Sequence, residues 1–488
     1  MKPKWIAILL LLVTAIVRFP FYFVDVINWD ESTFILMGQS LLDGHLPYTE
    51  LWDIKPPLAF AAYALFILIF GKSIVGIRIA GTLCVFATAW LVYLTGKQIS
   101  SDRAGILAAV LTIIGVTVIR GGQSTMTQHV ACIFLAAGLA WLVSRKTSTL
   151  ELLVAGILLT LATLIRLNLA YVVVAVGLWL VFGWLRHKTV RLIAIAAYCL
   201  GSFGTIFLTY LPYLITNNSK IWFDSVILAP LSYSRSAGDA NAAINPIYAC
   251  LILGLLIFLW SKISASKQRE FVLLQVFTLG ILVSIVRGGE FHQHYYIQLF
   301  PFLALTIALL WDKIPYQIIR LSVVGLIAAG LFSALEPIAA QYQFMSDRLH
   351  AGQPLRYGTA YEIAAYLQEN NPERAPVYLM KDHIIYWLTD LKPLSKAATH
   401  PSNLGKDYLF EYISGAGSSS AVELERILAQ KPKFIIKKTA DPYIDDRPAI
   451  ESILSAVLER DYRLDRQIGD REIYQIEQSL ADEHGSDR

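Results

Sequence analysis

The sequence predicts a polytopic α-helical membrane protein with a C-terminal α/β domain. Of its 488 residues, 56% are apolar and only 16% are charged, whereas soluble domains are about 25% charged. The charge is also uneven, because residues 337–488 hold 41 of the 78 charged side chains, and apolar runs of membrane-spanning length recur before them. These observations exclude a soluble single-core protein and a disordered chain. The lack of any basic block gives no support for nucleic-acid binding.

Eleven apolar runs are long enough, or nearly so, to cross a bilayer. We expect these spans at about 5–23, 74–95, 104–119, 129–143, 150–166, 168–185, 191–215, 246–260, 270–286, 294–311 and 317–335. The first run is not a cleaved signal peptide, because it continues through Arg18 into aromatic residues without a small-residue cleavage site.

One further apolar run, residues 57–70, is assigned by the charges of the loops. If it does not cross, the cytoplasmic pieces are 1–4, 96–103, 144–149, 186–191, 261–269 and 312–320. These pieces carry 14 Lys or Arg in 42 residues, whereas the opposite loops carry six in 96. Cytoplasmic loops are rich in Lys and Arg, and a run of 14 residues is short for a span. We therefore expect an interfacial helix at 57–70, a cytoplasmic N-terminus and an extracytoplasmic C-terminal domain in the inner (plasma) membrane.

The chain accordingly divides into a membrane domain, residues 1–336, and an extracytoplasmic α/β domain, residues 337–488. Apolar periodicity in the second domain predicts helices at 358–370 and 421–430, and strands at 377–380, 433–436 and 472–476. This domain has no recognisable catalytic motif. We therefore expect the chemistry in the first outer loop, residues 24–73, which holds six acidic side chains.

The first outer loop carries the densest set of ionisable groups, and such groups at a membrane edge are costly and mark function. Asp30 and Glu31 follow Trp29 at the start of an amphipathic stretch that ends at Gly44. A helix N-terminus favours an ionised carboxylate, which can take a proton from an acceptor hydroxyl or amine. The alternative is that Asp30 only caps this helix.

Lys55 is the second candidate, since it stands before two prolines in a loop that is rich in anions. A cation held by a rigid turn could neutralise a phosphate leaving group. The alternative is an ion pair with Asp53 or Asp30.

A third cluster lies where the tenth span begins, and it contains Arg287, His292, His294, Tyr295 and Tyr296. These side chains could bind phosphate or sugar hydroxyls, or they could form an aromatic belt at the membrane interface. A His-x-His pair could also suggest a metal, but the spacing fixes no third ligand, so we expect no metal site.

Taken in order, these motifs resemble those of the GT-C membrane glycosyltransferases, specifically the bacterial relatives of protein O-mannosyltransferases and of the aminoarabinose transferase ArnT. The matching features are Asp30-Glu, Leu-x-x-Gly-x-x-Pro-Tyr48, Lys55-Pro-Pro, Phe70-Gly, Gly-Ile-Arg78 and a late His-Tyr-Tyr-x-x-x-x-Pro301. The resemblance covers the layout of the whole chain, and it is strongest in sequence over 24–100 and 287–301.

The resemblance implies inverting transfer of a sugar from a polyprenyl-phosphate donor at the outer face of the membrane. In this mapping Asp30 is the base or orients the acceptor, with Glu31 beside it, and Lys55 lies near the donor phosphate. Fixed positive charge at the leaving phosphate makes an acid catalyst less necessary.

The resemblance also implies roles at the ends of the spans. Arg166 takes the place of a basic residue that contacts phosphate, and Tyr295 or Tyr296 takes the place of a late Tyr. Arg78 and Gln128 are expected to contact the substrates. Many relatives have an acidic residue in the second outer loop, residues 120–128 here, where this chain has Gln128. Because an amide cannot ionise, a second carboxylate and a metal there are in doubt, and we expect no cofactor.

The sequence therefore predicts an integral-membrane glycosyltransferase whose partners are a lipid-linked donor, the bilayer and an extracytoplasmic acceptor, either lipid, glycan or protein. One alternative is a ligase of the same architecture that moves a whole lipid-linked glycan. The other is a secondary transporter, which would have midplane ionisable groups and paired halves with broken helices, and neither a repeat nor such a pair is evident.

Overall fold

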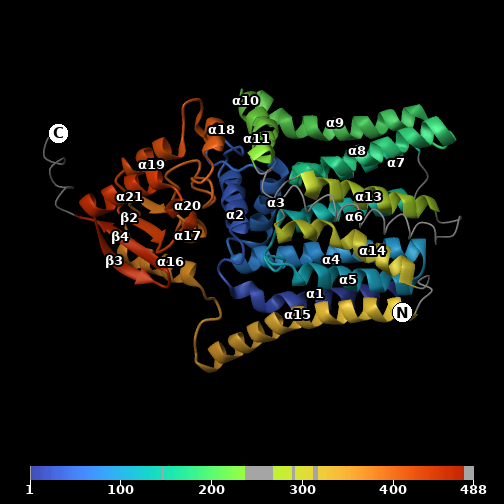
Figure 1. Ribbon diagram of the computed structural model, residues 1–488, viewed down its shortest axis with the longest axis horizontal. Helices are drawn as coiled ribbons and strands as arrows, with labels where there is room; N and C mark the ends of the chain where they lie inside the picture. The colour runs from blue at the N-terminus through green and yellow to red at the C-terminus, as the bar shows by residue number, and fades with distance from the viewer. Residues whose placement is uncertain (1, 145–147, 237–267, 288–291, 312–316, 478–488) are drawn as a thin grey trace.

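The computed structural model describes residues 2–144, 148–236, 268–287, 292–311 and 317–477, which form a helical bundle and a smaller mixed domain at one end of it (Figure 1). The bundle helices are α1 (Pro3–Arg18), α2 (Trp29–Leu42), α3 (Pro57–Phe70), α4 (Ile74–Ile99), α5 (Asp102–Val118), α6 (Thr127–Ser144), α7 (Thr149–Ile165), α8 (Ala170–Phe182), α9 (Leu192–Ile215), α13 (Gln268–Arg287), α14 (Phe300–Leu310) and α15 (Gln317–His350). Shorter turns join them: η1 (Phe19–Phe23), η2 (Leu167–Leu169), η3 (Gly183–His187), α10 (Ser219–Phe223), η4 (Asp224–Leu228), α11 (Ala229–Ser236) and η6 (Gln293–Gln298).

Two of the bundle helices, α4 and α5, start at a serine whose side chain satisfies a free backbone N–H group. The Ser73 hydroxyl accepts a hydrogen bond from the Gly76 N–H at the start of α4, and α5 starts in the same way at Ser101. The outer faces are apolar, as on α9, where Leu200 and Phe203 are more than two-thirds exposed. Such faces suit a lipid environment rather than water.

Six of the described helical segments are long and apolar enough to cross a membrane. They are Pro3–Phe23, Ile74–Ile99, Thr127–Ser144, Leu167–His187, Leu192–Ile215 and Gln268–Arg287. The run expected at 246–260 lies outside the described residues. The multi-pass helical class is therefore confirmed, whereas the count of eleven spans stays a prediction.

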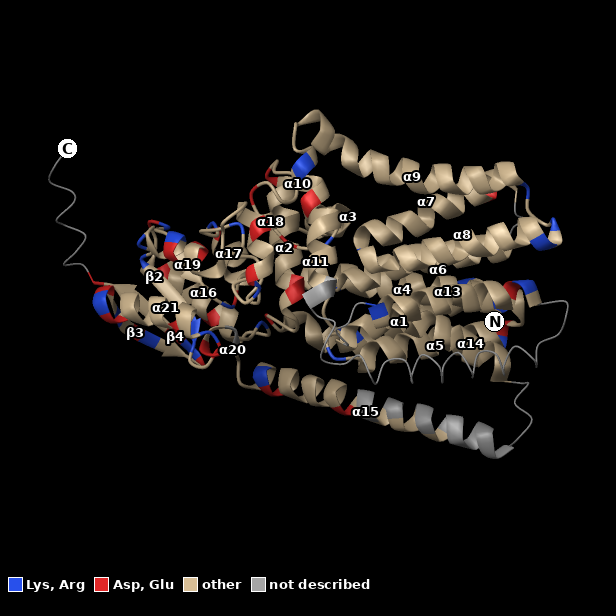
Figure 2. Cartoon of the chain, turned by 45° about the horizontal axis from the view of Figure 1, so that its top comes forward, with Lys and Arg blue, Asp and Glu red and all other residues tan. Residues whose placement is uncertain are grey.

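Charged residues gather toward the two ends of the bundle, and the helices between them are nearly free of charge (Figure 2). The α8–α9 connection, with Lys188, lies at the end of the bundle remote from the C-terminal domain. Lys72, from the expected outer loop, forms an ion pair with Asp390 of the C-terminal domain. That loop and the C-terminal domain are thus at the same end, and the charge counts predict that this end faces outward.

The C-terminal domain is built on a four-stranded sheet in the order β1-β2-β4-β3. Its strands are β1 (Val377–Leu379), β2 (Phe434–Lys438), β3 (Tyr462–Ile468) and β4 (Arg471–Ile476). Its helices are α16 (Thr359–Asn370), α17 (Ile384–Thr389), η8 (Asp407–Leu409), α18 (Phe410–Ser414), α19 (Ser420–Leu428), α20 (Pro442–Asp445) and α21 (Pro448–Asp461). β1 and β2 are parallel, while β4 is antiparallel to both β2 and β3.

All five expected elements of this domain occur, as α16, α19, β1, β2 and β4, each within a few residues of its expected position. β3 was not predicted, because the edge strand is mostly exposed and carries charged residues that hide its alternation. The boundary predicted at 336/337 falls inside α15, which continues to His350. The last expected span and the link to the C-terminal domain are therefore one helix, and the globular domain begins after it.

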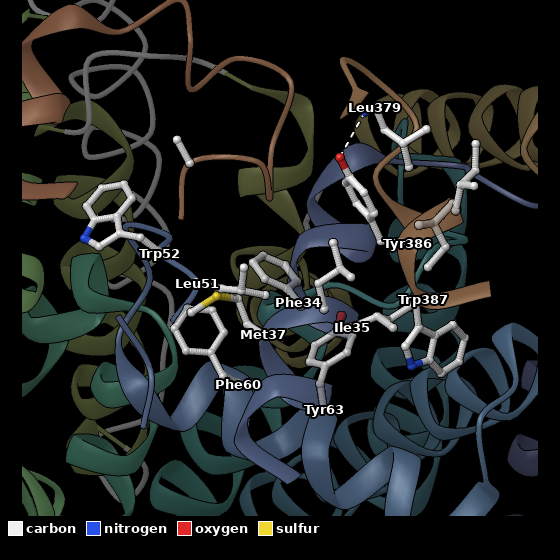
Figure 3. Packing of buried hydrophobic residues seen from close by; sticks show 14 of the residues in the cluster. Phe34, Ile35, Met37, Leu51, Trp52, Phe60, Tyr63, Leu379, Tyr386 and Trp387 are labelled. Atoms are coloured by element: carbon white, nitrogen blue, oxygen red, sulfur yellow. Dashed lines mark hydrogen bonds between the residues drawn. The ribbon is translucent and has the colours of Figure 1, made fainter. Parts of the chain in front are cut away.

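The first outer loop and the C-terminal domain share one apolar core (Figure 3). It joins Phe34, Ile35, Met37, Leu51, Trp52, Phe60 and Tyr63 of the loop to Leu379, Tyr386 and Trp387 of the domain. As a result α2, which was expected to be amphipathic, is buried on nearly every face from Glu31 to Gly38. The start of α2 is therefore held in place by the rest of the first outer loop on one side and by the C-terminal domain on the other.

Candidate functional site

A cavity of about 650 Å³ lies where the first outer loop, the second outer loop, η6 and the C-terminal domain meet. Its walls include Ile27, Asn28, Trp29, Asp30, Trp52, Asp53, Ile54, Lys55, Arg120, Gly121, Tyr233, His292, Gln293, His294, Tyr295, His400, Ser402, Asn403, Lys406 and Leu409. The structure thus brings together five of the predicted site residues, Asp30, Lys55, His292, His294 and Tyr295. A volume of this order accommodates a small polar ligand.

Asp30 lies in the first turn of α2, as the sequence predicts. The helix is capped by Asn28, whose side-chain oxygen accepts a hydrogen bond from the Asp30 N–H at 3.0 Å. The capping alternative for Asp30 is therefore wrong, because the residue two positions earlier caps the helix. Its carboxylate instead meets two histidines, with Oδ1 at 3.2 Å from His400 Nε2 and Oδ2 at 3.9 Å from His294 Nε2.

The electrostatic surroundings keep Asp30 ionised. Burial alone would raise the pKa of its carboxyl group, but the charge of Lys55 and the hydrogen bond from His400 outweigh burial and hold the pKa well below its usual value. Oδ2 has no hydrogen bond to any residue that the structure describes. An ionised carboxylate oxygen with a free lone pair, beside a cavity, can accept a proton from a bound hydroxyl.

Lys55 is positioned by its own backbone. Its N–H donates to Asp53 Oδ1 at 3.0 Å, and its carbonyl oxygen accepts from the Tyr48 hydroxyl at 2.6 Å. The ammonium lies 5.8 Å from the centre of the Phe34 ring, a cation–π arrangement. Asp53 thus orders the Lys55 backbone rather than neutralising its side chain, and the cation stays available to a ligand in the cavity.

The η6 turn contributes a stacked aromatic group. The rings of His292 and His294 stack at 5.4 Å, and Tyr295 packs edge-on against both. Burial lowers the pKa of His294 to about 3, against the opposing effect of Asp30. His294 is therefore neutral near pH 7 and can give or accept a hydrogen bond. Tyr295 and Tyr296 both pack against the apolar core of the helical bundle. Of the two, Tyr295 also lines the cavity, so Tyr295 is the Tyr that can meet a ligand there.

Arg166 does not line this cavity but lies behind Tyr295, with its guanidinium carbon 5.0 Å from the ring centre. It is 5% exposed, and its one hydrogen bond to a described residue goes to Thr127 at 3.4 Å. Gln128 is fully buried beside Thr127, and its side-chain nitrogen has no partner among the described residues. Arg166 and Gln128 form a polar layer beneath the cavity. Arg287 ends α13 and is exposed outside the cavity.

Glu31 and Arg78 are not in the cavity, and this corrects two predicted roles. Arg78 is completely buried and binds Glu31 at 2.8 Å. Its remaining N–H groups donate to backbone oxygens of Phe21, Val24 and Asp25. Because every guanidinium donor is used inside the protein, Arg78 has none left for a substrate. Glu31 also accepts from the Thr125 N–H at 2.6 Å, so this pair ties α2 to α4 and the second outer loop.

Sequence reasoning missed the contribution of the C-terminal domain. His400, Ser402, Asn403 and Lys406 line the cavity, as does Arg120 from the second outer loop. No local motif marks them, since they follow one another in an irregular segment far from Asp30 in sequence. Among the described residues, no group of three or more His, Cys, Asp or Glu side chains is arranged to hold a metal ion. The absence of a cofactor stays a prediction.

The chain is similar to known proteins in part of its sequence and in its fold. Residues 54–202 match the family model described as dolichyl-phosphate-mannose-protein mannosyltransferase. The chain shares the fold of ArnT from Cupriavidus metallidurans bound to undecaprenyl phosphate, with a TM-score of 0.61 and 12% identity over 97% of this chain and 98% of that chain. No curated protein has a significantly similar sequence.

Oligosaccharyltransferases from Archaeoglobus fulgidus also share the fold. The apo form has a TM-score of 0.56 and 11% identity, over 90% of this chain and 70% of that chain. The enzyme AglB, in complex with an inhibitory peptide and a dolichol-phosphate, has a TM-score of 0.51 and 12% identity, over 98% of this chain and 74% of that chain. The predicted resemblance to ArnT-like and mannosyltransferase-like GT-C proteins is therefore confirmed.

Proposed function

Because the chain has the GT-C glycosyltransferase architecture, we propose that it transfers one sugar from a polyprenyl-phosphate donor to an extracytoplasmic acceptor with inversion. The acceptor oxygen forms a bond to the anomeric carbon while the bond from that carbon to the phosphate oxygen breaks. The electron pair leaves with the polyprenyl phosphate, and the acceptor proton passes to Asp30. This step needs no oxidant and no cofactor.

The observation that carries the proposal is that an ionised carboxylate and a lysine line the same cavity. Asp30 and Lys55 both line it, and Lys55 is the strongest influence that keeps the pKa of Asp30 low. The carboxylate serves the acceptor, and the ammonium serves the leaving phosphate. A base for the acceptor and a fixed cation for the leaving phosphate, both in one cavity, meet the chemical needs of inversion.

Further positive charge supports a phosphate in or near the cavity. Arg120 and Lys406 lie in its walls, and Arg166 lies beneath Tyr295 in the membrane domain. A buried guanidinium with one long hydrogen bond among the described residues is costly unless an anion joins it. A lipid phosphate that enters from the bilayer would reach Arg166 and Lys55 from the membrane side, and the sugar would lie toward Asp30.

The ligase alternative uses the same architecture but a much larger donor. A cavity of about 650 Å³ favours one sugar with its phosphate over an oligosaccharide. The fold and the matched family model give no support to the transporter alternative. Transfer of a single sugar at the extracytoplasmic face of the inner membrane is therefore the function that we propose.

The experiment is transfer by the purified protein in lipid nanodiscs supplied with single-sugar polyprenyl phosphates, with envelope lipids and glycans as acceptors. Mass spectrometry of the envelope glycans and lipid-linked sugars of a deletion strain identifies which donor and which acceptor to supply in this assay. We expect transfer from the lipid-linked sugar and none from the matching nucleotide sugar. Lys55→Ala should abolish most of it, whereas Lys72→Ala, which removes an exposed ion pair, should not. Transfer of intact glycans alone would favour the ligase.

A further inference from the structure

A histidine of the C-terminal domain reaches the carboxylate of Asp30. His400 Nε2 lies 3.2 Å from Asp30 Oδ1. The other ring nitrogen, Nδ1, accepts a hydrogen bond from the Ser402 N–H at 3.1 Å. Since Nδ1 acts as an acceptor, the proton of the neutral ring is on Nε2, the nitrogen that faces Asp30 Oδ1. The tautomer of His400 is therefore set by its own loop.

The segment that carries His400 is bound to the first outer loop on both sides of the site. The Trp52 N–H donates to the Lys396 carbonyl at 3.0 Å, and the Thr399 hydroxyl donates to the Trp52 carbonyl at 2.7 Å. The Thr33 hydroxyl, one turn after Asp30, donates to the Thr399 carbonyl at 2.7 Å. Thr399 is completely buried. These contacts hold the segment against the parts of the loop that carry Asp30 and Lys55.

We propose that His400 is a positioning residue for glycosyl transfer, which orients the Asp30 carboxylate through Oδ1 and leaves Oδ2 directed at the acceptor. The inference rests on the proposed function, because it assigns His400 a role only through Asp30. A carboxylate rotates easily about its last side-chain bond, and a single fixed donor removes that freedom. Small errors in the position of a reacting group cost up to about a hundredfold in rate.

This inference gives the C-terminal domain a part in the chemistry. The shared core and the Thr399 contacts place a side chain from beyond residue 350 beside a carboxylate near the N-terminus. The site is then complete only when the domain is docked on the first outer loop. His400 touches Asp30 and need not touch either substrate, so its loss should lower kcat more than it raises KM.

The test compares His400→Ala, His400→Gln and His400→Asn in the full-length protein. The glutamine side-chain nitrogen can occupy the position of Nε2 and donate to Oδ1, whereas the asparagine nitrogen corresponds to Nδ1 and falls short. We expect His400→Ala and His400→Asn to lower kcat about ten- to a hundredfold with little change in the KM for the donor. His400→Gln should restore most of the rate, and thermal unfolding in detergent should be alike in the three variants.

A double-mutant cycle separates this role from a structural one. In an Asp30→Asn background, His400→Ala should change turnover less than about threefold, because its effect passes through the missing carboxylate. Equal fold losses in both backgrounds would overturn the inference, as would normal kcat in His400→Ala while Asp30→Asn is inactive. That last result would leave the proposed function intact. Full turnover in Asp30→Asn would instead contradict both the role of His400 and the proposed role of Asp30 as the base.

Discussion

The buried pair of Glu31 and Arg78 gives a prediction that opposes the roles expected from sequence. Both side chains are nearly inaccessible, at 3% and 0% exposed, and Arg78 uses all its other donors on backbone oxygens. Removing one partner of such a pair costs about 3–5 kcal/mol, because the other charge stays buried without a counter-ion. Glu31→Gln keeps the shape and one acceptor oxygen, so we expect the free energy of unfolding to fall by about 3 kcal/mol.

The assay is SDS-induced unfolding of the purified protein in mixed micelles, followed by tryptophan fluorescence. Glu50→Gln is the matched control, since Glu50 is 34% exposed and pairs with His45 at 3.3 Å and Lys392 at 3.9 Å. Such exposed pairs contribute at most about 1 kcal/mol. Turnover of the folded fraction should stay within a few-fold of wild type in both variants. A Glu31→Gln protein that unfolds like wild type but has lost turnover would refute this reasoning and restore Glu31 to the chemistry.

Three other predictions follow from the site and the topology. Lys55→Ala and Arg166→Ala should each lower donor use severely, whereas Lys55→Arg and Arg166→Lys should retain more activity in the transfer assay, because phosphate binding needs the charge first. His294→Gln should make the protein less sensitive to acid. In the unfolded chain this histidine binds a proton below about pH 6.5, whereas in the folded protein it does so only near pH 3. At pH 5 the histidine therefore lowers the free energy of unfolding by about 2 kcal/mol, which the glutamine variant should recover. In cysteine labelling, Lys72→Cys should react from outside the cell and Lys188→Cys only after permeabilisation.

Each of these has an outcome that contradicts it. Equal losses in the four cation variants would argue against a phosphate clamp. The same pH dependence of unfolding in His294→Gln as in a variant of the exposed His187 would mean that His294 is not buried in the neutral form. Labelling of Lys72→Cys only after permeabilisation would invert the topology.

Much of the fold could be predicted because membrane helices are local. Length and apolarity fix the approximate limits of a helix such as α4, and the loop charges order the spans without any tertiary information. The strands β1, β2 and β4 were predicted from short apolar runs. β3 and the course of α15 past residue 336 were not predicted. An exposed polar strand and the polar continuation of a helix carry no hydrophobic pattern of their own.

The site was only half predictable, for a different physical reason. Asp30 and Lys55 belong to one loop with a readable motif, and the structure brings both to one cavity. Glu31 stands beside Asp30 in sequence, yet a helix turns successive side chains by about 100°. Glu31 therefore points to Arg78 and away from the cavity. His400 depends on the docking of a domain hundreds of residues away, which no local pattern encodes.

The central claim is that Asp30 supplies the catalytic carboxylate, and its replacement by asparagine tests this most directly. Asp53→Asn is the matched control, because Asp53 lines the same cavity but acts through a hydrogen bond to the Lys55 N–H that an asparagine oxygen can also accept. General-base catalysis contributes about 10²–10⁴-fold in rate. Measured at equal amounts of folded protein, turnover should fall at least about a hundredfold in Asp30→Asn and stay within a few-fold of wild type in Asp53→Asn. Near-normal turnover in Asp30→Asn would contradict the account.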